Sequence, residues 1–83
     1  MRRNESVMAR TVGNEVVLLD VESGRYFGLN DVGAAVWNHL ADDCSLSDLV
    51  EAVVAAFDVE DDQAASDVNA LMRDLIDAGL VTE

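Results

Sequence analysis

The stretch GRYFGLNDVGAAVW, residues 24–37, decides how this chain is read. Its first part places the aromatic pair Tyr26 and Phe27 just after a glycine turn, a pattern typical of a short strand. Asn30 follows, a residue favoured at helix N-caps, and the apolar residues after it recur at helical spacing. The stretch therefore predicts a strand that passes directly into a helix.

Two further β-rich runs come before this strand, VMARTV at 7–12 and EVVLLD at 15–20. The turn dipeptide Gly13-Asn14 separates them, and Glu22-Ser23-Gly24 separates the second run from the third. Short β-rich runs divided by glycine turns predict a three-stranded antiparallel meander.

The faces of the third strand follow from the alternation of side chains along a strand. Phe27 and Leu29 share one face, which we expect to point inward, and Tyr26 and Gly28 share the other. Gly28 weakens the strand and permits close approach by another backbone.

Three helices are expected after the strands. The first follows Asn30, and the second begins at a capping box formed by Ser45 and Asp48. A third helix begins in the acidic run 59–62, because carboxylates suit the positive end of a helix dipole. Gly79 is well placed as the residue after its C-cap. The predicted fold class is α+β, a three-stranded antiparallel sheet followed by three helices, with residues 1–83 forming a single domain.

The charge of the chain is strongly acidic and unevenly distributed. It has 17 acidic residues against five basic ones, all arginines, for a formal net charge of −12. Residues 1–41 are nearly balanced, whereas residues 42–83 hold twelve of the acids and only Arg73. The second half therefore repels phosphate backbones and attracts basic partners, unless its acids serve only as a solvated face.

Catalytic and metal sites are not indicated by the sequence. His39 and Cys44 are the only imidazole and the only thiol, and two ligands do not make a zinc site. Nothing orients the histidine as a base for the thiol, the glycines form no phosphate loop, and no cofactor is indicated. We expect a protein that is not an enzyme. With no run of about 18 apolar residues and no secretory signal, cytoplasmic localisation and no membrane contact are the default expectation.

Two alternative functions remain open. Asp43-Cys44-Ser45-Leu46 loosely resembles the attachment site of acyl carrier proteins, although Ser45 already serves as a helix cap. A winged-helix DNA-binding regulator would also suit three helices with a β-hairpin. The acidic second and third helices argue against DNA as a partner.

The order and spacing of several motifs resemble the PqqD-like family, whose members bind leader peptides in ribosomal peptide biosynthesis. The likeness runs from about Val16 to Val81, and the stand-alone length is most similar to the recognition proteins of lasso-peptide clusters. The pieces that carry it are the aromatic strand into LNDVGAAVW (29–37), SLSDLV (45–50), and FDV (57–59) leading to DVNALMRDL (67–75). Asp61 departs from the family, in which proline often begins the third helix.

The resemblance implies a winged-helix-like fold in which a leader peptide adds as a strand to the edge of the third strand, in a groove roofed by the third helix. An open edge without lysine, proline or a bulge suits such a role. On the third helix, one flank offers apolar contact and carboxylates, and the opposite flank carries Asn69, Arg73 and Ile76. Periodicity does not say which flank faces the groove. The expected peptide-binding residues are Arg25, Tyr26, Phe27, Gly28, Leu29, Asp67, Leu71, Asp74 and Ala78.

The mechanism that the resemblance implies is delivery rather than catalysis. The protein would hold the leader of a precursor peptide and present it to a leader peptidase or, in the parent PqqD-like setting, to a radical enzyme. The open edge also allows a dimer as well as a monomer, because two copies can pair through it.

Overall fold

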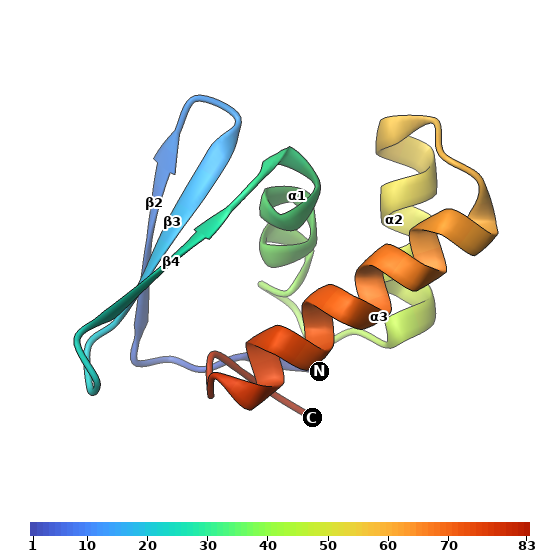
Figure 1. Ribbon diagram of the computed structural model, residues 1–83. Coiled ribbons are helices and arrows are strands. Elements are labelled where there is room, and N and C mark those ends of the chain that lie inside the picture. The colour runs from blue at the N-terminus through green and yellow to red at the C-terminus, as the bar shows by residue number, and fades with distance from the viewer.

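The computed structural model describes residues 1–83 (Figure 1). The order of the three long strands and the three helices is the predicted one, so the α+β class is confirmed. The strands are β1 (Arg2–Arg3), β2 (Val7–Val12), β3 (Glu15–Asp20), β4 (Arg25–Leu29) and β5 (Val81–Thr82), and the helices are α1 (Asp31–His39), α2 (Leu46–Phe57) and α3 (Asp61–Asp77).

The main sheet is the expected antiparallel meander, in the order β2-β3-β4. Val12 pairs with Glu15 across the first turn, where Gly13 has a φ of +62°, the left-handed conformation that two-residue hairpin turns require. Leu18 of β3 pairs with Phe27 of β4. β3 is the central strand, and β2 and β4 each have one hydrogen-bonded neighbour.

The helix starts are fixed by the predicted caps. The Asn30 side chain accepts a hydrogen bond of 2.9 Å from the Gly33 amide at the start of α1. At the start of α2, the Ser45 amide donates to Asp48 Oδ2 at 3.0 Å and the Asp48 amide donates to Ser45 Oγ at 3.2 Å. Both bonds of the capping box are present, so these two predictions are confirmed.

The end of α3 is a Schellman motif centred on Gly79. Its φ is +76°, its amide donates to the Ile76 carbonyl at 3.0 Å, and the Leu80 amide donates to the Leu75 carbonyl at 2.9 Å. Leu80 is fully buried, so the turn returns the chain to the core. The predicted cap is confirmed.

A second, two-stranded sheet joins the ends of the chain and was not predicted. Arg2 of β1 pairs with Thr82 of β5, and Arg3 pairs with Val81. Two-residue strands are too short to give a periodic signal, and the pairing joins segments nearly a full chain length apart. The buried Val81 packs into the core, and Asn4 donates hydrogen bonds of 2.9 Å from its backbone amide to the Leu80 carbonyl and from its side chain to the Gly79 carbonyl.

The core consists of 15 buried apolar side chains drawn from the main sheet, the three helices and the last residues, and no polar side chain is buried. Figure 1 shows α1 between the main sheet and α2, with α3 running obliquely below them. All helices therefore lie on one side of the sheet. Its inner face contributes Val16, Leu18 and Leu29 to the core.

Candidate functional site

The free edge of β4 is the first part of the candidate site. Because β4 pairs only with β3, alternate residues of β4 direct their backbone N–H and C=O groups away from the sheet. No proline interrupts this edge. Backbone groups of this kind are able to pair with one further strand.

The side chains of β4 divide between the two faces as expected. Leu29 is buried, and Phe27 is half-buried against the core. Tyr26 is 70% exposed on the opposite face. The Arg25 guanidinium lies over the Phe27 ring, 5.2 Å from its centroid.

The two flanks of α3 have different surroundings, which periodicity alone left open. Asn69 borders a hollow that α3 forms with α2, and Arg73 and Ile76 border a second hollow with Leu46 and Met1. This flank therefore faces α2 and the start of the chain.

The other flank of α3 points away from α2 and carries Asp67, Leu71 and Asp74 of the residues expected from the resemblance, and Ala78, the fourth, is the C-cap residue just beyond the helix. Leu71 and Ala78 are half-buried against the same core as Phe27. Asp67 and Asp74 are exposed, and Asp67 Oδ1 accepts a hydrogen bond of 2.9 Å from Gln63. Apolar side chains at the core margin are thus bordered by carboxylates open to solvent. None of the principal hollows is lined by residues of both β4 and α3.

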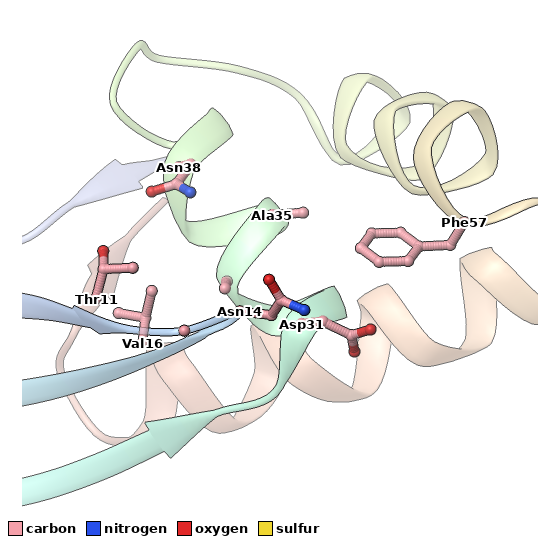
Figure 2. A pocket seen from close by; sticks show the side chains of 9 residues that line it. Thr11, Asn14, Val16, Asp31, Ala35, Asn38 and Phe57 are labelled. Carbon is pink, nitrogen blue, oxygen red and sulfur yellow. The ribbon is translucent and has the colours of Figure 1, made fainter.

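A separate pocket of about 410 Å³ lies where the β2–β3 turn meets α1 and the end of α2 (Figure 2). Figure 2 shows the Phe57 ring pointing toward it, and Asn14 and Asp31 are among the other residues that line it. None of the expected peptide-binding residues lines this pocket. The pocket is therefore distinct from the β4 edge.

His39 and Cys44, the only imidazole and the only thiol of the chain, do not form a hydrogen-bonded side-chain pair. The Cys44 thiol contacts the His39 backbone carbonyl, with 3.8 Å between sulfur and oxygen, rather than the imidazole. Burial, together with nearby aspartates, raises the pKa of Cys44, which lowers its thiolate fraction and its reactivity. No cluster of three or more possible metal-ligating side chains is present, and no helix is long and apolar enough to cross a bilayer.

A family comparison places these features in context. Residues 15–81 match the family model described as coenzyme PQQ synthesis protein D (PqqD). The chain belongs to the PqqD family. The match covers β3, β4 and all three helices, and its range includes every residue of the candidate site.

Two solved structures resemble this PqqD-family chain over nearly its whole length. One, described as TbiB1 in complex with the TbiA(beta) leader peptide, has a TM-score of 0.87 and 30% identity, covering 96% of this chain and 93% of that one. The other, described as lasso peptide synthetase B1 complexed with the leader peptide, has a TM-score of 0.83 and 29% identity, covering 99% and 96%. A comparison with curated protein sequences gives no match.

One part of this PqqD-family structure was missed at the level of sequence. Met8, Leu19 and Tyr26 stand next to one another across the three strands, on the face of the sheet opposite the core. The signal was present in the alternation of β2 and β3, which puts Met8, Val12, Val17 and Leu19 on the outer face beside Arg10 and Glu15.

Proposed function

We propose that this protein binds the leader segment of a ribosomally made precursor peptide by strand addition to β4, and that it has no catalytic activity of its own. The observation that carries the proposal is the open backbone edge of β4 in a PqqD-family chain. Both similar solved structures are described as complexes with leader peptides, which supports the same ligand class here.

Strand addition gives affinity through the backbone and selection through side chains. A leader strand beside β4 takes up the N–H and C=O groups that β3 leaves unpaired. Its side chains alternate, and those on the inner face meet Phe27 and the Leu71 flank of α3. An apolar leader residue that packs against the half-buried Phe27 and Leu71 is removed from water, and this burial of apolar surface favours binding.

The charge of α3 selects the leader further. Asp67 and Asp74 on the proposed binding flank are exposed, and no lysine or arginine lies on that flank. A leader with a basic residue beside its apolar anchor therefore gains attraction, and a strongly acidic leader is repelled.

The role that follows is delivery. We propose that the bound leader is presented to a processing enzyme, a leader peptidase of the lasso-peptide type, and that residues 1–83 act as one winged-helix-like recognition domain. The similarity to lasso peptide synthetase B1 supports a peptidase over a radical enzyme as the partner. The acyl-carrier alternative is weakened because the Ser45 hydroxyl caps α2.

The test is an NMR titration of the isotopically labelled protein with a synthetic leader from the precursor gene beside its own. The protein is first shown to be folded and monomeric by sedimentation. We expect saturable shifts at residues 25–29 and at the Leu71 flank of α3, with little change at 7–12 of the other edge strand. A scrambled leader is the matched peptide control.

Backbone pairing is tested by N-methylation of the leader. Methylation of a residue whose N–H faces β4 removes a hydrogen bond and is expected to abolish binding, whereas methylation of the next residue leaves it nearly unchanged. Absence of shifts with the native leader, or equal effects of methylation at both positions, would overturn strand addition at β4.

A further inference from the structure

The outer face of the main sheet carries an apolar surface that no part of the chain covers. Met8, Leu19 and Tyr26 form one cross-strand row, and Arg10, Val17 and Gly28 form the next. Met8 is 62% exposed and Tyr26 is 70% exposed. Contiguous apolar patches exposed on a protein surface commonly mark sites of interaction with another molecule.

These rows enclose a shallow hollow of about 360 Å³, which we call the sheet socket. Leu19 and Val17 belong to its central strand, and Met8 and Tyr26 stand on the strands to either side. The sheet socket is lined by Met8, Ala9, Arg10, Val17, Leu19 and Tyr26.

Arg10 gives the sheet socket its charge. The Arg10 side chain makes no salt bridge and no hydrogen bond, although the chain holds 17 acidic residues. Glu15 is the acidic residue on the same face, and it lies beyond Arg10 at the turn end of the strands. The face therefore joins an apolar hollow to an unpaired cation, in a protein whose net charge is −12.

We propose that the sheet socket is the docking site of the processing enzyme, which inserts an apolar side chain beside a carboxylate that pairs with Arg10. This inference rests on the proposed function. A second copy of the chain is a poorer occupant, because it presents an arginine at the same place and brings a second net charge of −12.

The bound leader enlarges the same surface. Residues directly opposite one another on paired strands point to the same face of a sheet. A leader residue paired with Tyr26 therefore extends the row Met8–Leu19–Tyr26 by a fourth side chain on the outer face. The enzyme then contacts protein and leader together and binds the loaded protein more tightly than the empty one. By linkage, the enzyme tightens leader binding by the same factor.

The test measures binding of the peptidase encoded in the same gene cluster, by calorimetry, to the protein with and without leader. Met8→Ser lies two strands from the leader edge, so leader affinity is expected to stay within about twofold. Enzyme affinity is expected to fall at least about tenfold. Arg10→Gln is expected to weaken the enzyme and to reduce the salt dependence of its binding.

The matched control is Val54→Ser on α2, which borders the hollow between α2 and α3 that is rimmed by Glu51, Asp61 and Asp62. It is expected to leave enzyme binding unchanged. Loss of enzyme binding in Val54→Ser but not in Met8→Ser would place the enzyme at that acidic hollow and overturn the sheet socket.

The remaining outcomes separate this inference from the proposed function. If the leader binds and the enzyme does not, or if Met8→Ser only abolishes self-association, the sheet socket proposal fails and leader capture stands. If the enzyme binds the empty protein in a Met8-dependent way and no leader binds, leader capture fails and the sheet socket stands.

Discussion

Arg3 and Trp37 hold the start of the chain against α1. The Arg3 guanidinium lies over the Trp37 ring at 4.9 Å from the centroid, and Arg3 Nε donates a 2.9 Å hydrogen bond to the Trp37 carbonyl. That carbonyl lies in the last turn of α1, where it also accepts a 3.2 Å hydrogen bond from the Leu40 amide and where a cation is favoured by the helix dipole. Partial burial lowers the pKa of Arg3, which stays charged at any physiological pH.

Replacement of Arg3 is expected to destabilise the protein although Arg3 lies outside the candidate site. Arg3→Ala removes the stacking and the hydrogen bond, with a loss of about 1–2 kcal/mol in the free energy of unfolding. Arg2→Ala is the matched control, since Arg2 is exposed and its side chain makes no hydrogen bond, and it is expected to change stability by less than about 0.5 kcal/mol. Urea unfolding measures both, and equal losses would contradict the prediction.

The two flanks of α3 are expected to respond differently to truncation. Leu71→Ala and Ile76→Ala each shorten a half-buried side chain, so each lowers the thermal midpoint. Only Leu71→Ala is expected to weaken leader binding, by about tenfold, because the Ile76 flank faces α2 and the start of the chain. Fluorescence anisotropy with a labelled leader measures the affinities. Greater loss in Ile76→Ala would assign the leader to the opposite flank.

The capping box of α2 makes a pH-dependent contribution to stability. Hydrogen bonds from the Ser45 backbone amide, and next from the Ser45 side chain, lower the pKa of Asp48. A carboxylate with a lowered pKa stabilises the fold above its unfolded pKa, and this contribution is lost as the pH falls through the folded pKa. Thermal midpoints of the wild type and Asp48→Asn are therefore expected to differ at pH 7 and to converge in strong acid. A constant difference at all pH values would contradict the role of the charge.

Alanine substitutions at Gly79 and Gly28 distinguish the cost of backbone strain from the cost of a steric clash. A Cβ atom at either position meets nothing within 4 Å, but Gly79 has a φ of +76° and Gly28 does not lie in the left-handed region. Gly79→Ala is expected to cost about 1–2 kcal/mol. Gly28→Ala is expected to be neutral or slightly stabilising, because glycine weakens a strand. Chemical unfolding of the two variants gives the comparison, and similar losses would show that the Schellman turn accepts a side chain.

Much of the fold and of the β4 edge was predictable from the sequence. The helix caps at Asn30 and Ser45 and the turn at Gly79 depend on residues only three to five positions apart. Hydrogen bonds over so short a range can be predicted from the local residue pattern alone. The strand over residues 25–29 was likewise predictable from its own residues and the glycine turn before it. These elements also set the face on which Leu29 enters the core.

Tertiary structure decided which neighbour each face meets. The periodicity of α3 defines two flanks, but the packing of α2 determines that Asn69 faces the bundle and leaves Leu71 on the other side. The pairing of Arg3 with Val81 and the row of Met8, Leu19 and Tyr26 likewise join residues distant in sequence. The physical reason is that hydrogen bonds within one turn need only a local pattern, whereas the partner of an apolar face is set by the packing of the whole chain.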